Sequence, residues 1–253
     1  MSKKVLLLAT NYGAWAEELQ APWDALNQAG FDVTMATPQG KKPLPFALSI
    51  DPDFDDPLQH YKVNPPEVCL RVKQILEGTE WNHPAKIADV KMSDYEALVL
   101  TGGPGVCLDI TNNPKVHRLI LDAFQAGKLI GAICYSVGAL AFTRNPANGF
   151  KSVLWGKKST AHPRAWDFDF DLSYTLAGTT PDNQGTDVVT PGFLLPLQDV
   201  VTDAVGPQGE CVADEGANRV KPCVVYDEPF VTALSVESSI AYGQKLAEVL
   251  RSR

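Results

Sequence analysis

Residues 129–138 read Leu-Ile-Gly-Ala-Ile-Cys-Tyr-Ser-Val-Gly, an apolar run that reaches a cysteine and continues through small residues. The run from Leu129 to Cys134 is typical of a strand buried on both faces of a parallel sheet. A helical pattern begins at Val137, so strand and helix are joined by a very short turn. Such a turn is typical of a nucleophile elbow, and the positive end of the helix lowers the pKa of a thiol placed there. Cys134 is therefore the candidate nucleophile.

The other four cysteines give this interpretation an alternative. They lie at positions 69, 107, 211 and 223, and no CxxC pair occurs in the chain. Most free cysteines are small buried hydrophobes, and Cys134 could likewise end a core strand with no chemical role. Its position in the predicted sheet favours the nucleophile.

Outward from this stretch, apolar runs alternate with helical patterns. Further strands are predicted at 4–10, 31–37 and 95–101, and helices at 15–30, 66–78, 113–127 and from 137. This alternation predicts an α/β fold with a doubly wound, mostly parallel central sheet flanked by helices. Beyond residue 150 the pattern predicts a strand at 157–161, a helix at 196–205, strands at 222–226 and 229–234, and a closing helix at 237–251.

No linker or composition shift divides the chain, so we predict a single domain over residues 1–253. Two stretches without clear periodicity, near 38–65 and 164–196, are predicted to be insertions that wall a pocket.

The composition disfavours several classes of function. The formal net charge is −8, which disfavours nucleic acid and anionic membrane surfaces as partners. No apolar run is long enough to span a bilayer, and the first ten residues are too short for a signal peptide. We expect a cytoplasmic protein that acts on a small-molecule substrate and uses no cofactor or metal.

Ligands of open α/β sheets bind at the carboxyl ends of the strands. The loop Gly102-Gly103-Pro104-Gly105 follows the predicted strand 95–101 and lacks the Lys-Ser/Thr ending of a phosphate loop. We predict that backbone N–H groups of Gly103 and Tyr135 hold negative charge that develops near Cys134. A plain tight turn is the alternative.

Two acidic residues, Glu17 and Glu18, open the first predicted helix. Serving the helix dipole is the default for such residues, and it is what we predict for Glu17. A carboxyl facing the strand ends would need a raised pKa, so that it could donate a hydrogen bond to the sulfur.

Four histidines stand at 60, 83, 117 and 162, without the spacing of a zinc site. The first three are expected to be exposed. His162 follows the predicted strand 157–161, and a His at a strand end beside Cys134 would make a general-base pair.

Taken together, these motifs resemble the ThiJ/PfpI superfamily, which has a flavodoxin-like, class I glutamine-amidotransferase-like fold. The resemblance rests on Gly13-x-x-x-x-Glu18 with Pro22, on the glycine loop, on AICYS around Cys134, and on FVTALSVESS at 230–239. It implies that Glu18 is the carboxyl beside the reactive thiol of Cys134. It also implies a homodimer.

Two branches of this superfamily share features with the chain. The His162-Pro163 pair is similar to that of the Parkinson-disease deglycase branch, while the length and the first insertion are similar to the heat-shock chaperone and glyoxalase III branch. That branch carries a His directly after its cysteine, where this chain has Tyr135, and often a His in its glycine loop, where this chain has Pro104. Asp167 falls near the acid of that branch's Cys-His-acid triad, which lacks its His here.

We therefore predict a cysteine-dependent hydrolase or lyase for a small electrophile, such as a reactive aldehyde, an amide or a related carbon–nitrogen compound. Cys134 would attack, Glu18 would position and protonate, and His162 would move protons, with Asp167 as a possible second acid. The alternative is a non-catalytic redox-sensing or stress protein that uses the same cysteine. A chaperone surface would require an exposed apolar patch.

Overall fold

A computed structural model describes residues 2–56, 60–167, 173–176, 186–189 and 193–253. Its centre is a seven-stranded sheet in the order β12-β13-β5-β4-β1-β2-β3. All neighbouring strands pair in parallel except β12 and β13, which are antiparallel. The doubly wound, mostly parallel α/β sheet predicted from the sequence is confirmed. The strands of this sheet are β1 (Lys4–Leu8), β2 (Asp32–Thr37), β3 (Ala85–Lys86), β4 (Ala97–Leu100), β5 (Leu129–Ile133), β12 (Val224–Asp227) and β13 (Phe230–Ala233).

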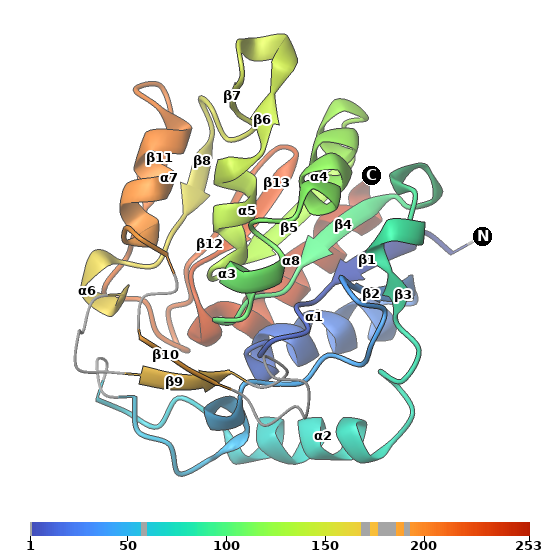
Figure 1. The fold of residues 1–253 in the computed structure, drawn as a ribbon, viewed down its shortest axis with the longest axis vertical. Coiled ribbons are helices and arrows are strands. Elements are labelled where there is room, and N and C mark those ends of the chain that lie inside the picture. The colour runs from blue at the N-terminus through green and yellow to red at the C-terminus, as the bar shows by residue number, and fades with distance from the viewer. Residues whose placement is uncertain (1, 57–59, 168–172, 177–185, 190–192) are drawn as a thin grey trace.

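Helices cover both faces of the sheet (Figure 1). On one face α1 packs against α8 and α2, and on the other α4 packs against α5, which in turn contacts α7. The buried residues of α4 recur at three- and four-residue spacing, which is why the helix lies flat on the sheet. The helices are α1 (Ala16–Gln28), α2 (Pro66–Glu77), α3 (Val106–Asp109), α4 (Pro114–Gln125), α5 (Ser136–Phe142), α6 (Arg164–Asp167), α7 (Leu197–Val205) and α8 (Ser239–Ser252).

The core is continuous across the middle of the sheet. Every residue of β4 and β5 is buried, as is every residue of β1 after Lys4. These are the apolar runs of the sequence, and burial on both faces explains why they do not alternate with polar residues. None of the described helices is long and apolar enough to cross a membrane.

The remaining strands form three small two-stranded sheets beside the main one. The strand predicted at 157–161 pairs with a strand near 211, outside the central sheet, and is held against it by a hydrogen bond from Thr160 N to Thr232 Oγ1. These strands are β6 (Arg144–Asn145), β7 (Lys151–Ser152), β8 (Lys158–Thr160), β9 (Ser173–Leu176), β10 (Thr186–Val189) and β11 (Glu210–Val212).

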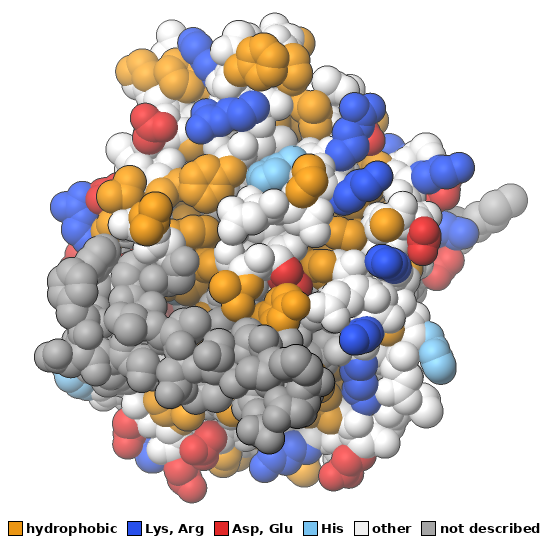
Figure 2. Space-filling model, in the orientation of Figure 1, with side chains coloured by type: hydrophobic (Ala, Val, Ile, Leu, Met, Phe, Trp, Pro, Cys, Tyr) orange, Lys and Arg blue, Asp and Glu red, His pale blue; other side chains and the backbone are white. Residues whose placement is uncertain are grey.

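Several large apolar side chains are exposed, including Phe150 at 68% in the β6–β7 connection and Leu194 at 99%. Figure 2 shows orange hydrophobic side chains at the top of the view, where Figure 1 places β6 and β7, while Lys and Arg side chains lie mostly on the right. The homodimer that the family resemblance implies would bury some of this surface, and it stays a prediction.

Candidate active site

Cys134 occupies the turn between β5 and α5 and has φ of +58°, which is unusual for a residue other than glycine. The Ser136 hydroxyl stabilises this turn, since it accepts a hydrogen bond from Ile133 N at 2.9 Å and donates one to Ile133 O at 2.7 Å. Cys134 N also donates to Ala233 O in the adjacent β13. The backbone is therefore strained at one residue and held on both sides, as in a nucleophile elbow.

Small residues flank the elbow because large neighbours lie against it. A Cβ on Gly131 would lie 2.5 Å from the Tyr242 hydroxyl, and one on Gly138 would lie 2.8 Å from the Phe193 ring. Contacts from α8 and from the segment before α7 thus explain why residues 131 and 138 are glycines, which the sequence alone attributes to the tight turn.

The Cys134 side chain is buried, yet the pKa of its thiol is lowered. Burial by itself would raise this pKa, but the positive charge of His162 and hydrogen bonding to the backbone N–H groups of Gly103 and Tyr135 lower it. The sulfur therefore has the environment of a thiolate, and both predicted backbone donors lie beside it.

The glycine loop approaches the site so closely that side chains are excluded. A Cβ on Gly102 would lie 2.2 Å from Glu18 Oε2 and 2.7 Å from Cys134 Cβ. Gly103 has φ of +106°, and its Cβ would lie 2.2 Å from Trp15 N. The loop is thus fitted between the start of α1 and the elbow.

Glu18, in the first turn of α1, is 1% exposed. Burial raises its pKa well above the ordinary value, and Cys134 adds to this effect although His162 opposes it. Its Oε2 has no hydrogen-bond partner in the described part of the chain. Burial thus favours the protonated form of Glu18, whose carboxyl can donate a hydrogen bond to the sulfur of Cys134.

Glu17 lies in the first turn of α1, where the sequence places it, but it also has a partner that the sequence does not predict. Its carboxylate is buried and paired with Arg219, whose two terminal nitrogens donate to the two oxygens at 2.7 and 2.6 Å. Arg219 also donates to Val63 O. Arg219 lies 202 residues further along the sequence, and no local pattern predicts the pair.

His162 follows β8 and is 8% exposed. Its Nδ1 lies 3.1 Å from Asp167 Oδ1, which also accepts a hydrogen bond from the Tyr135 hydroxyl at 3.0 Å. Leu197 N donates to Asp167 Oδ2 at 2.7 Å. Each oxygen of the buried Asp167 carboxylate is thus occupied, and the imidazole is fixed in orientation.

Burial by itself would lower the pKa of His162, but Cys134 and the hydrogen-bonded Asp167 raise it well above its ordinary value. Because Nδ1 bonds to Asp167, Nε2 is the ring nitrogen left for the hydrogen bond with Cys134 that contributes to the shifted pKa values of both residues. The triad of the glyoxalase III branch lacks its His at position 135, but His162 and Asp167 supply a His and an acid to Cys134 in another way. The imidazole comes from His162, at the end of a different strand.

The Tyr135 side chain is a feature that sequence reasoning missed. The sequence predicts a role only for its backbone N–H and shows it in place of a His of one branch. In the structure its ring lies 5.0 Å from the His162 ring, centroid to centroid, and its hydroxyl contacts Asp167. Burial and the charge of Asp167 raise its pKa well above the ordinary value, so it remains a hydrogen-bond donor.

The other predicted features have mixed outcomes. His60 and His83 are exposed, whereas the same prediction for His117 is wrong: it is half-buried, and its ring nitrogens bond to Thr143 Oγ1 and Thr111 O. The first insertion places Phe46 and Phe54 against Trp15, beside the glycine loop, while most of the insertion at 164–196 lies outside the described residues. The described residues contain no group of three His, Cys, Asp or Glu side chains that could hold a metal.

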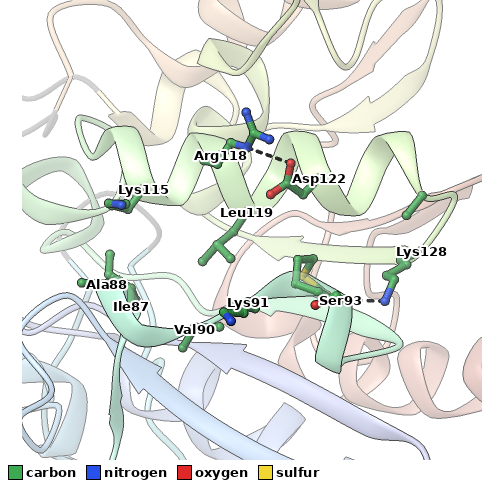
Figure 3. A pocket seen from close by; sticks show the side chains of 12 residues that line it. Ile87, Ala88, Val90, Lys91, Ser93, Lys115, Arg118, Leu119, Asp122 and Lys128 are labelled. Carbon is green, nitrogen blue, oxygen red and sulfur yellow. Dashed lines mark hydrogen bonds and ion pairs between the residues drawn. The ribbon is translucent and has the colours of Figure 1, made fainter.

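A pocket of about 410 Å³ lies between α4 and the segment 87–93 (Figure 3). We call it the α4 pocket. Arg118 pairs with Asp122 across one turn of the helix at 2.8 Å, and Lys128 donates to two backbone carbonyls. None of the unpartnered buried polar atoms found in the described residues belongs to this pocket.

Comparison with known proteins identifies the relatives of this chain. The DJ-1/PfpI family matches residues 3–167. The glutathione-independent glyoxalase hsp3102 of Schizosaccharomyces pombe is 25% identical to this chain, and the match covers 64% of this chain and 70% of the relative. The glutamine amidotransferase-like class 1 domain-containing protein 1 of Bos taurus is 26% identical, and the match covers 90% of this chain and 84% of the relative. The crystal structure of glyoxalase III from Candida albicans matches with a TM-score of 0.71 at 19% identity, covering 97% of this chain and 96% of that one, a likeness of fold.

Proposed function

Because this chain belongs to the DJ-1/PfpI family, we propose that it is a cysteine-dependent enzyme that converts small 2-oxoaldehydes into 2-hydroxy acids. The observation that carries the proposal is a thiol of lowered pKa at a strained turn, beside a fixed His and a neutral Glu. The glyoxalases among its relatives support the choice of substrate class.

The first step is addition to the aldehyde. The Cys134 thiolate forms a bond to the aldehyde carbon while the carbonyl electron pair moves to oxygen. The backbone N–H groups of Gly103 and Tyr135 stabilise the oxyanion, and the protonated His162 gives it a proton through Nε2. The product is a neutral hemithioacetal beside a neutral imidazole.

The second step is an isomerisation. Neutral His162 removes the proton from the former aldehyde carbon and returns it to the neighbouring carbon, while the Glu18 carboxyl protonates the ketone oxygen and takes the proton of the hemithioacetal hydroxyl. This converts the hemithioacetal into a thioester of a 2-hydroxy acid. Asp167 keeps the imidazole oriented through Nδ1.

The third step is hydrolysis. Water, deprotonated by His162, adds to the thioester, and the Cys134 thiolate leaves. The sum of the steps is the substrate plus one water, and no external thiol is needed.

The test is turnover of methylglyoxal by the purified protein without added thiol, with lactate measured by chromatography and Cys134→Ser as the control. The proposal predicts lactate formation by the wild type alone. Equal turnover by Cys134→Ser, or no lactate from the wild type, would contradict it.

A second candidate is hydrolysis of a small amide, favoured by the Cys134–His162–Asp167 set and by the amidotransferase-like relative. Incubation of the same protein with small amides, with ammonia and amine measured, tests it. Release of ammonia or amine without lactate formation would replace the first candidate by this one.

A redox sensor is the non-catalytic alternative, because a thiol of lowered pKa is also prone to oxidation. Mass spectrometry after mild peroxide treatment tests it. Selective oxidation of Cys134 in a protein that turns over none of these compounds would favour the sensor.

A further inference from the structure

The loop after β1, residues 10–15, crosses the glycine loop beside the elbow, and we call it the β1 loop. Both chains have a glycine in the left-handed region at this crossing, with φ of +107° at Gly13 and +106° at Gly103. A Cβ on Gly103 would lie 2.7 Å from Gly13 O, so the two backbones touch with no room for a side chain. Two backbone hydrogen bonds of 3.2 Å join them, from Gly105 N to Gly13 O and from Trp15 N to Gly102 O.

Asp109, at the end of α3, binds the start of the β1 loop with both carboxylate oxygens. Its Oδ1 accepts a hydrogen bond from the Thr10 hydroxyl at 2.6 Å, and its Oδ2 accepts one from Asn11 N at 2.9 Å. The Thr10 hydroxyl accepts in turn from Tyr12 N at 3.0 Å, so its single hydrogen goes to the carboxylate. One side chain thus fixes three consecutive residues of the β1 loop.

The short helix α3 connects Asp109 to the glycine loop. It begins directly after Gly105, and the glycine loop accepts its first backbone hydrogen bonds, from Val106 N to Gly103 O and from Cys107 N to Pro104 O. A movement of Asp109 away from the β1 loop would therefore move the glycine loop as well.

The environment of Asp109 makes its carboxylate costly. Asp109 is half-buried, and this burial raises its pKa to about 6 although the hydrogen bonds from Thr10 and Asn11 lower it. No basic side chain of the described residues forms an ion pair with it. A charge withdrawn from solvent without a counter-ion destabilises a fold, and such local costs are typical of residues that serve a site.

The position of the glycine loop matters to the thiol. Gly103 N donates a hydrogen bond to Cys134, which contributes to the lowered pKa of this thiol. Gly102 lies between the two reacting side chains, since a Cβ there would lie 2.7 Å from Cys134 Cβ and 2.2 Å from Glu18 Oε2. Hydrogen bonds weaken steeply when their geometry is distorted, so a small displacement of this loop would weaken the bond to the sulfur.

We propose that Asp109 is a positioning residue: by holding Thr10 and Asn11 it fixes the glycine loop so that Gly103 N points at the Cys134 sulfur. Asp109 acts through the backbone and is not a catalytic residue. Its effect on turnover rests on the proposed function, whereas its effect on the thiol does not.

The first experiment measures the rate of Cys134 alkylation by iodoacetamide against pH, followed at the Cys134 peptide by mass spectrometry. We expect Asp109→Leu to raise the midpoint by about 0.5 to 1 pH unit, the size expected when one hydrogen bond to the thiolate weakens. Removal of a negative charge would by itself lower the pKa of a nearby thiol, so the direction separates positioning from a charge effect. An unchanged or lowered midpoint would overturn the proposal.

Thr111→Val is the matched control. Thr111 is buried just after α3, and its hydroxyl lies 3.3 Å from both Val106 O and Cys107 O, so it stabilises α3 without bonding to the β1 loop. This variant should move the midpoint by less than about 0.2 pH unit. A shift as large as that of Asp109→Leu would show that any loosening of α3 suffices, and the assignment to Asp109 would fall.

Thr10→Val tests the same contact from its other side, and it carries the test if Asp109→Leu does not fold. It should raise the midpoint, because the carboxylate loses its shorter hydrogen bond. The double variant should shift the midpoint no further than the larger single shift, since both changes break one contact. Additive shifts, or no shift in Thr10→Val, would refute the proposal.

Steady-state kinetics with methylglyoxal separates this inference from the proposed function. We expect Asp109→Leu to lower kcat by about 10- to 100-fold and to change KM by less than about 3-fold, because the donor to the oxyanion is misplaced. A raised midpoint in a protein whose wild type has no turnover would sink the proposed function alone. Turnover by the wild type with the same midpoint in Asp109→Leu would sink the role of Asp109 alone.

Discussion

The Cys134 site and the α4 pocket both contain charged side chains, but these side chains differ in their exposure to solvent. In the α4 pocket, Arg118 and Asp122 form an ion pair whose side chains are 71% and 35% exposed (Figure 3). At the Cys134 site, Glu18 and Asp167 are 1% and 0% exposed. Unpaired polar atoms, shifted pKa values and a strained residue are found together only at the latter of these two regions.

This difference shows what distinguishes a reactive site from a mere cavity. Charges in solvent are screened, so the Arg118–Asp122 pair contributes at most about 1 kcal/mol to the stability of the fold. Charges removed from solvent interact strongly and change their protonation states. Substitutions matched between the two regions therefore test the account.

The largest effect is expected for Cys134→Ala. Loss of the nucleophile should lower kcat/KM for the 2-oxoaldehyde by about 10³-fold or more, because the covalent route disappears. Lys91→Ala in the α4 pocket should leave kcat/KM within about 2-fold of the wild type. Steady-state kinetics measures both, and a comparable loss in the Lys91 variant would remove the contrast between the regions.

The second largest effect is expected for Asp167→Asn. An amide cannot hold the imidazole and its charge as a carboxylate does, so kcat should fall by about 10²-fold while KM changes little. The same substitution in the α4 pocket, Asp122→Asn, is the control and should be neutral. If Asp167→Asn kept wild-type kcat, Asp167 would be a structural residue only.

A stability effect of intermediate size is expected for Glu18. Because its folded-state pKa is raised, the native state keeps a proton that the unfolded chain loses above about pH 4.3, so ionisation favours unfolding as the pH rises. Glu18→Gln removes this penalty. As the pH rises above about 4.3, the free energy of unfolding of the variant should increase relative to that of the wild type by up to about 1.4 kcal/mol per pH unit. The increase should stop once the pH passes the folded-state pKa of Glu18.

Urea unfolding at several pH values measures this difference. The Asp122→Asn variant should instead stay within about 0.5 kcal/mol of the wild type over the same range. A Glu18→Gln protein whose stability runs parallel to that of the wild type would show that Glu18 ionises as in the unfolded chain.

The smallest effect is expected for Tyr135→Phe. Removing one hydrogen bond to Asp167, which keeps two other partners, should lower kcat by about 3- to 10-fold. Tyr226→Phe, at a half-exposed position in β12, should be silent. A loss as large as that of Asp167→Asn would mean that Tyr135 acts on the substrate itself.

Much of the fold could be predicted because its signals are local. The strands β1, β4 and β5 are continuous apolar runs, and the elbow is announced by small residues around Cys134. The sequence does not predict the two-residue strand β3, since Ala85–Lys86 is too short to show a pattern.

The details of the site depend on contacts between distant residues, which local patterns do not carry. Asp167 is held by Leu197 N and Tyr135, and Glu17 by Arg219. Only the folded chain fixes such arrangements.

The central claim is that His162 holds Cys134 as a thiolate, and the pH dependence of Cys134 alkylation tests it most directly. A lowered pKa means that the thiolate persists to lower pH, so the alkylation rate should rise with a midpoint below the value of about 8.5 for a free cysteine. In His162→Ala the midpoint should move upward, because the positive charge is gone. A midpoint at or above 8.5 in the wild type, unchanged in the variant, would contradict the claim.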